Sequence, residues 1–161
     1  MPNVPFYTWP PLAPSGEGWF EPTPEKLIAQ LPAVSARFGS ESVEYAAMLV
    51  QIGDAHMVQG LLSNPKAQAS YEAALEIVRA REDAGPEIAC VHDKLACVKQ
   101  SSGDSVGAQA DLEKAVSFWR ENPPTNRLAP VPHNDHVARR EEDLQRLIQL
   151  NAFLKRKPPQ L

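Results

Sequence analysis

The sequence lacks the features that identify several classes of protein. Its 161 residues include only two cysteines. No stretch of about 18 apolar residues, the length that crosses a bilayer, occurs in it. The first residues lack the charged and apolar regions of a secretory signal and the Arg-rich pattern of a transit peptide. We therefore expect a cytoplasmic protein with no membrane span.

The two cysteines, Cys90 and Cys97, lie on one expected helix. Seven residues of helix place them roughly 10 Å apart along the axis, which is beyond the reach of a disulfide. Their spacing also matches no common zinc motif, because no second ligand pair lies nearby. We interpret them as two thiols in a reducing compartment.

Basic charge is also scarce, since the chain carries a net charge of -4. A nucleic-acid-binding domain is usually basic, so we expect no nucleic-acid partner. The sequence has no phosphate-binding glycine loop and no recognisable nucleophile motif. These absences predict a protein that is not an enzyme, with no catalytic residue, no cofactor and no metal.

One metal-binding alternative stays open. His133, Asp135 and His136 could bring three ligands together in a loop. A metal-dependent enzyme on a helical scaffold would follow from such a site. We favour an exposed polar loop, because no further ligand pair is near in the sequence.

Proline is concentrated at the N-terminus. Seven of the sixteen prolines lie in the first 24 residues, and proline disfavours both helix and sheet. Disordered linkers are poor in aromatic residues, but this segment has five. We therefore expect residues 1–23 to form an extended arm that packs on the protein's own helices or on a neighbouring subunit, through Phe6, Tyr7, Trp9, Pro11, Pro14, Trp19 and Phe20.

The arm also suggests another function. Pro11-Leu12-Ala13-Pro14 has the PxxP form of a polyproline ligand. The chain would then be a ligand for another module, although the pattern is short and common.

The rest of the chain has a composition typical of a soluble domain, with 43% hydrophobic and 22% charged residues overall. Apolar residues at helical spacing predict an all-α fold. We expect helices over 24–38 with a break at Pro32, then 42–60, 67–81, 86–100, about 105–121 and 135–155. Gly53 lies inside the second of these, at a cost of about 1 kcal/mol relative to Ala. A close helix–helix crossing would explain that glycine.

Residues 89–121 give the clearest pattern, in which two helical segments meet at Ser101-Ser102-Gly103-Asp104. An earlier pair is related to it, because residues 67–75 align with residues 108–116 at an offset of 41. The repeats are therefore about 46–81 and 89–122.

These residues resemble a tetratricopeptide repeat (TPR), in which small residues lie where helices cross and Gly lies at the turn. The resemblance rests on Leu95-Ala96, Gly103-Asp104, Ala108, Leu112 and Ala115. The long period and the acidic Gly-Pro link are similar to the repeats of kinesin light chain, which would allow a cytoskeletal or ciliary location. The resemblance implies a short TPR-like helical-hairpin solenoid over 24–156, with capping helices at 24–38 and 135–155. His92 and Lys99 depart from the pattern, because the usual repeat has large apolar residues there.

The family binds peptides or helices in a concave groove lined by the first helix of each repeat. In this chain the corresponding positions are Ala47, Val50, Asp54, Met57, Cys90, Asp93, Cys97 and Gln100. The Lys and Asn of a carboxylate clamp are missing, so we do not expect a receptor for acidic C-terminal tails. The mixed apolar and acidic groove would suit a helix or a weakly basic segment, unless the N-terminal arm fills it.

We therefore expect a non-enzymatic protein–protein interaction scaffold, or a structural subunit of a larger complex, whose partners are other proteins.

Overall fold

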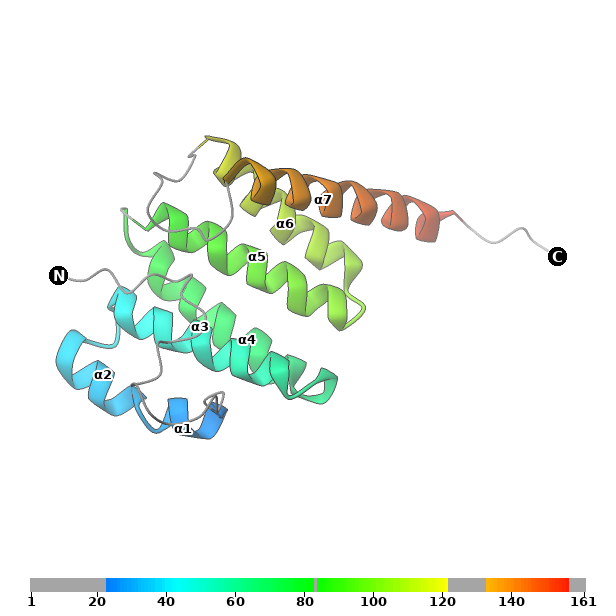
Figure 1. Cartoon of the computed structure of the whole chain (residues 1–161). Helices are drawn as coiled ribbons and strands as arrows, with labels where there is room; N and C mark the ends of the chain where they lie inside the picture. Colours follow the sequence, from blue (N-terminus) through cyan, green and yellow to red (C-terminus); the bar gives the residue numbers. More distant parts are fainter. Residues whose placement is uncertain (1–22, 83, 122–132, 157–161) are drawn as a thin grey trace.

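The computed structural model describes residues 23–82, 84–121 and 133–156, and most of these residues are helical, with no strand among them (Figure 1). The all-α class predicted from the sequence is confirmed for this part of the chain. The N-terminal arm predicted over 1–23 lies outside it, apart from Thr23. The elements in chain order are α1 (Pro24–Ile28), α2 (Leu31–Phe38), α3 (Val43–Val58), the 3-10 helix η1 (Leu61–Ser63), α4 (Asn64–Arg79), α5 (Gly85–Ser101), α6 (Ser105–Glu121) and α7 (His133–Lys155).

Side-chain caps start the first helices where the sequence predicts. The Thr23 hydroxyl accepts a hydrogen bond from the backbone N–H of Lys26 at 3.4 Å, and Pro24 follows in the first turn of α1. The Ser42 hydroxyl accepts from the N–H of Tyr45 at 3.1 Å and starts α3. Such caps satisfy N–H groups that have no partner inside the helix.

Two prolines lie differently from the prediction. The helix break expected at Pro32 is present, but it lies at Ala29 and Gln30, so Pro32 falls in the first turn of α2. A helix was expected to start at Ala67, but α4 starts three residues earlier, at Asn64, and Pro65 lies in its first turn. The physical reason is the same in both cases. The first turn of a helix needs no N–H from proline, and the fixed φ of proline suits it.

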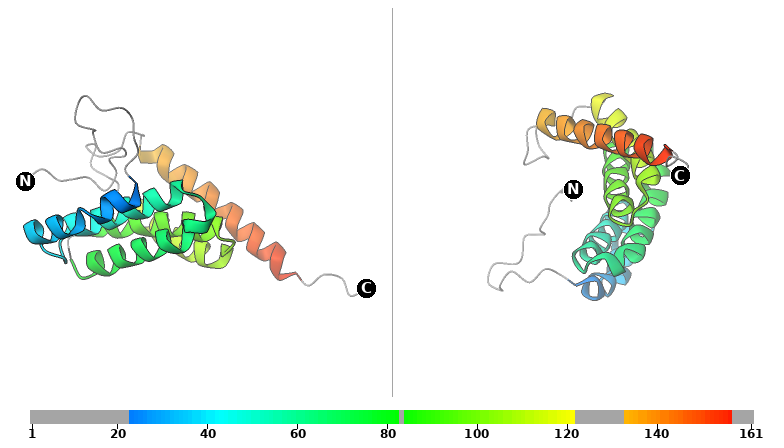
Figure 2. Two further views of the ribbon diagram at one scale, coloured as in Figure 1. Left: turned by 90° about the horizontal axis from the view of Figure 1, so that it is seen from below. Right: turned by 90° about the vertical axis from the view of Figure 1, so that its right-hand side faces the viewer.

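Consecutive helices pack against each other along a row. α3 packs on α4, α4 on α5, α5 on α6 and α6 on α7, while α1 and α2 pack on α3. Figure 2 (right) shows that the row bends, with α1 and α2 at one end and α7 at the other. The segments predicted to cap the row therefore stand at its two ends.

Positions that the 41-residue offset relates are buried alike in α4 and α6. All eight side chains are at most 5% exposed, and the pairs are Ala67 with Ala108, Tyr71 with Leu112, Ala74 with Ala115 and Leu75 with Val116. The turns before these helices match as well, because Gly60 and Gly103 have φ of 100° and 85°. Glycine adopts such backbone angles without strain.

Gly53 lies at the close helix crossing that the sequence predicts. A Cβ atom at this position would stand 2.7 Å from Cδ1 of Tyr71 on α4. Tyr71 is itself 1% exposed and belongs to the main core, with Val50, Val78, Val91 and Leu95. The missing side chain thus lets α3 and α4 approach around a buried aromatic ring.

The last helix, α7, has one buried side. Leu144, Leu147 and Asn151 are buried, and the two leucines join Leu112 and Val116 of α6 in one cluster. The remaining surface of α7 is mixed. It has the polar side chains of Arg139, Glu142, Gln145, Arg146 and Gln149 and the exposed apolar side chains of Ile148, Leu150, Phe153 and Leu154.

Within the described ranges, no helix is both long and apolar enough to cross a membrane.

Candidate functional site

Ion pairs connect α3, α5 and α7, although these helices are not consecutive. Lys94 Nζ on α5 lies 2.8 Å from Asp54 Oδ1 and 2.9 Å from Oδ2 on α3. On the other side of α5, Asp93 Oδ1 lies 3.0 Å from Nε of Arg140 on α7. Asp143 on α7 holds the same guanidinium at 3.2 Å. We call the surface formed by Asp54, Asp93, Lys94, Arg140 and Asp143 the ion-pair face.

A buried tyrosine anchors this face to the core. The Tyr71 hydroxyl on α4 donates to Asp54 Oδ1 at 2.6 Å. Burial raises the pKa of Tyr71, and the charge of Asp54 raises it further. One carboxylate therefore binds donors from two neighbouring helices, and its side chain is 17% exposed.

The cations of the face stay charged despite partial burial. Burial alone would lower the pKa of Lys94, but the adjacent Asp54 carboxylate outweighs it and leaves the pKa raised. For Arg140, burial is likewise outweighed, chiefly by Asp93, and its pKa is also raised. Charged hydrogen bonds of this kind are stronger than neutral ones.

Cys97 lies on the same face and is exposed, whereas Cys90 is buried. Partial burial raises the pKa of the Cys97 thiol, and Asp93 adds to this, while Arg140 and Lys94 act against it. A raised pKa means that little of the reactive thiolate is present near neutral pH. The pair forms no disulfide, as its spacing predicts.

The structure distributes the eight predicted groove residues over three environments. Ala47, Val50 and Cys90 are buried, and Val50 belongs to the main core with residues of α4 and α5. Asp54, Met57 and Asp93 are partly exposed, and Cys97 and Gln100 are exposed. A ligand on this face would therefore meet the last five side chains, whereas the first three serve packing.

The predicted groove is less acidic than its sequence suggests. Asp54 and Asp93 are the two acids among the predicted positions, and each faces a cation that the sequence analysis did not assign, Lys94 and Arg140. The carboxylates are thus largely neutralised within the chain. A basic ligand would have to compete with these pairs.

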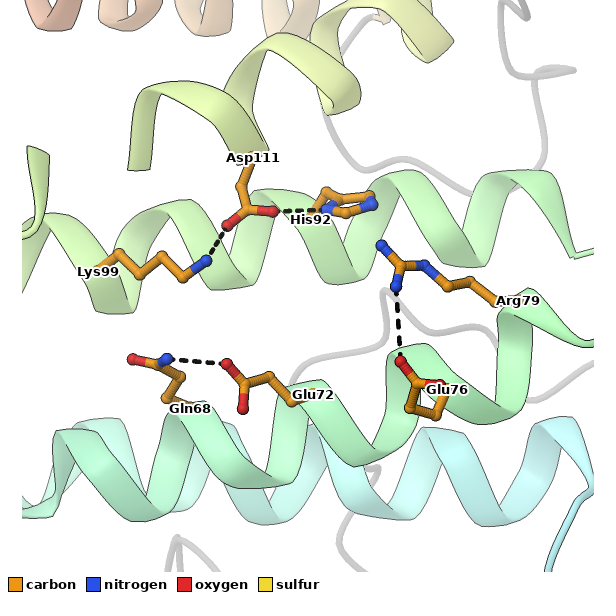
Figure 3. A network of polar contacts seen from close by, with 7 residues as sticks. All are labelled: Gln68, Glu72, Glu76, Arg79, His92, Lys99 and Asp111. Atoms are coloured by element: carbon orange, nitrogen blue, oxygen red, sulfur yellow. Dashed lines mark hydrogen bonds and ion pairs between the residues drawn. The ribbon is translucent and has the colours of Figure 1, made fainter. Parts of the chain in front are cut away.

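A second polar network lies between α5 and α6 (Figure 3). Asp111 Oδ1 lies 2.7 Å from His92 Nδ1, and Asp111 Oδ2 accepts from Lys99 Nζ at 2.6 Å. His92 and Asp111 are buried, at 4% and 5% exposed. Burial alone would raise the pKa of Asp111, but the hydrogen bonds from His92 and Lys99 hold it below its usual value.

This network gives a structural role to His92 and Lys99, the two polar residues that the sequence analysis noted on this helix. His92 and Lys99 lie one above the other on α5, two turns apart, and Asp111 on α6 binds both. Sequence reasoning singled out His92 and Lys99 but missed Asp111. The feature that could have identified Asp111 is its charge, because an aspartate at a buried helix position requires a partner.

The polar pairs on the exposed side of α4 contribute less to stability than the buried network does. Gln68 donates to Glu72 at 2.8 Å, and Arg79 lies 3.5 Å from Glu76 (Figure 3). Both side chains of the second pair are highly exposed, so water screens it. Exposed pairs of this kind contribute about 0–1 kcal/mol.

Several predicted residues lie outside the part that the structure describes. They are the arm residues Phe6, Tyr7, Trp9, Pro11, Pro14, Trp19 and Phe20, and the side chains of His133, Asp135 and His136. The main chain of His133–His136 forms the first turn of α7, where a loop was expected. Among the described residues, no three His, Cys, Asp or Glu side chains are grouped so that they could hold a metal ion.

Comparisons with protein-family models, with curated proteins and with solved structures find no match.

Proposed function

We propose that the chain is a non-enzymatic protein–protein interaction scaffold, or a structural subunit of a larger complex, built from two TPR-like hairpins. The hairpins are α3 with α4 and α5 with α6. The matched burial of α4 and α6 and the positive φ of Gly60 and Gly103 support this interpretation. In such arrays, first helices of successive units form one continuous binding surface.

The ion-pair face is the observation that carries the proposal. Lys94 and Asp93 are adjacent on α5 and reach in opposite directions, to α3 and to α7. These contacts connect α5 to both alternate helices, α3 and α7. Further along the same helices, Met57 is partly exposed, and Cys97 and Gln100 are exposed.

A helix with a mixed polar and apolar side is the ligand that fits these residues best. Met57 offers a flexible apolar contact, and methionine adapts to varied surfaces. Gln100 can both donate and accept hydrogen bonds. The ion pairs already neutralise Asp54 and Asp93, so the ligand does not need a basic tail.

Cys97 provides a direct test, because Cys90 is buried and will react far more slowly. A thiol-reactive photo-cross-linker attached to Cys97 should capture a discrete partner in native extract. As a matched control, Cys97→Ser with Glu72→Cys places the same reagent on the exposed outer side of α4. The control should not capture that partner.

The decisive measurement is the mass and identity of the adduct for each variant. An adduct from position 97 that unlabelled protein competes away would support the proposed face. Equal capture from both positions, or capture from neither, would reject it.

A further inference from the structure

One end of the helical row gathers the turns of both hairpins and the end of α7. Asn64 Nδ2, at the start of α4, donates to the hydroxyls of Ser101 and Ser102 at 2.8 and 3.0 Å. Asn151 Nδ2, near the end of α7, donates to the carbonyl of Ser105 at 3.0 Å. We call residues 58–66, 101–107 and 150–156 the turn end, which faces the viewer in Figure 2 (right).

The turn end carries the most exposed large apolar side chains of the described residues. Six side chains are 61% to 98% exposed, and all six belong to it: Val58, Leu61, Leu62, Val106, Phe153 and Leu154. Elsewhere the exposed fractions are lower, with 46% for Ile28 and 39% for Phe38. Single exposed apolar residues are ordinary, but the six most exposed ones all lie in the three segments of the turn end, and this concentration favours an interaction surface.

These highly exposed side chains lie in three separate places on the turn end. Leu62, at 98% exposed, lies in the one-turn helix η1 between α3 and α4. Val106 lies in the first turn of α6, and Phe153 and Leu154 lie in the last turn of α7. Three separate projections along one end suit a broad surface better than a single bound peptide.

The charge of the turn end is opposite to that of the whole chain. The three segments carry Lys66, Lys155 and Arg156, all exposed, against the single acid Asp104. Asp104 already accepts a hydrogen bond from the N–H of Gly107 at 2.8 Å. Glu25 on α1 is close enough to Lys66 for the two charges to interact, so the basic character is strongest at Lys155 and Arg156. The chain as a whole carries -4.

We propose that the turn end docks on the surface of a membrane rich in anionic lipids. The apolar side chains would enter the boundary between headgroups and acyl chains, while Lys155 and Arg156 meet the anionic headgroups. Exposed apolar residues beside basic ones are the pattern of interfacial anchors, which lie on a bilayer without spanning it. Each basic residue near an anionic surface adds about 1 kcal/mol of attraction.

Sedimentation of the full chain with vesicles tests this. The parent protein should bind phosphatidylcholine vesicles that contain about 30% phosphatidylserine and leave pure phosphatidylcholine vesicles largely unbound. Leu61→Ser with Leu62→Ser should weaken binding at least about tenfold, because two apolar side chains no longer insert. Lys155→Glu with Arg156→Glu should also weaken it about tenfold or more, and added salt should act in the same direction.

The matched control is Ile28→Ser with Phe38→Ser, which removes two exposed apolar side chains from α1 and α2. This variant should bind as the parent does. Circular dichroism checks that every variant keeps its helices, which is expected because the changed residues are exposed.

Three outcomes would overturn the proposal: no binding of the parent to anionic vesicles, equal loss in the control variant, or full binding by the turn-end variants. A fourth would be self-association. If the parent ignores vesicles but dimerises, and the change at Leu61 and Leu62 abolishes the dimer, the turn end contacts a second copy of the chain.

Discussion

Lys94 Nζ on α5 lies 2.8 Å from Asp54 Oδ1 on α3, and the same oxygen accepts the hydroxyl of Tyr71 on α4 at 2.6 Å. One carboxylate thus joins three helices. The lysine side chain is 34% exposed and the aspartate 17%. The aspartate is therefore the member whose loss leaves more buried groups without a partner.

The first prediction compares the loss of Asp54 with the loss of Lys94. Asp54→Ala should lower the free energy of unfolding by about 1–3 kcal/mol, because both Tyr71 and Lys94 lose their acceptor. Lys94→Met should cost less, about 1 kcal/mol or below, since Lys94 is partly exposed and Asp54 keeps the Tyr71 hydroxyl. Urea unfolding of both variants measures the difference. Glu76→Ala, from an exposed pair, is the control and should change little. Equal costs for Asp54→Ala and Lys94→Met would contradict the three-helix role.

The second prediction concerns alkaline pH. The folded pKa values of Tyr71 and Lys94 are both raised. A group with a raised folded pKa contributes stability that is complete below its unfolded pKa and is lost as the pH rises toward the folded value. The unfolded values are about 10 for Tyr and 10.4 for Lys, so the melting temperature should fall above about pH 10. Tyr71→Phe should reduce the slope there. A slope identical to that of the parent would show that Tyr71 titrates alike in both states.

The third prediction concerns acid pH and Asp111. Its folded pKa is lowered, so its contribution is present above the unfolded value of about 3.9 and is lost as the pH falls through the folded value. Asp111→Asn should flatten the pH dependence of stability in this acid range. Thermal melts from neutral pH down to the acid transition measure it. Glu72→Gln, on the exposed side of α4, is the matched control for replacing a carboxylate by an amide.

Substitutions of Asp111 also change stability at neutral pH. Asp111→Ala should cost about 3–5 kcal/mol, because the cation of Lys99 loses its buried partner. Asp111→Asn should cost less, since the amide oxygen can still accept a hydrogen bond from one of the two donors. If both cost under 1 kcal/mol, the network is neutral to folding, and His92 and Lys99 reach water when Asp111 is gone.

The parts of the fold that could be predicted depend on local patterns. Gly103 between two runs of helical spacing indicates a hairpin without any long-range information. The 41-residue offset also predicts the burial of Ala108 from that of Ala67, because both fill the same place in a hairpin. Helix starts were less predictable, since Pro65 suits a loop and a first helical turn equally well.

The candidate site was harder to predict because its pairs join distant parts of the chain. Asp93 and Arg140 are 3.0 Å apart only because α5 and α7 lie on one face of the row. Hydrophobic spacing assigns a residue to a helix face but not to the neighbour that covers it. Val50 was therefore expected in a groove, while the packing of α4 and α5 places it in the core.

The last prediction uses the contact between Gly53 and Tyr71. An alanine at position 53 would gain up to about 1 kcal/mol of helix propensity. Its Cβ, however, would stand 2.7 Å from Cδ1 of a buried ring, and forced overpacking costs about 1–3 kcal/mol. Gly53→Ala should therefore destabilise the parent in urea unfolding. The ring cannot easily move, since it is 1% exposed and its hydroxyl binds Asp54.

A double-mutant cycle identifies the ring as the cause. Tyr71→Val removes the ring atoms that lie near Gly53 and destabilises the protein by itself, because it opens a cavity. In that background Gly53→Ala should become neutral or stabilising, since the added methyl group fills part of the space and the gain in helix propensity remains. The two effects of Gly53→Ala should thus have opposite signs, which gives a coupling free energy of about 1–3 kcal/mol. If Gly53→Ala lowers the stability equally in both backgrounds, the Tyr71 ring is not the cause. The close α3–α4 crossing would then not explain Gly53.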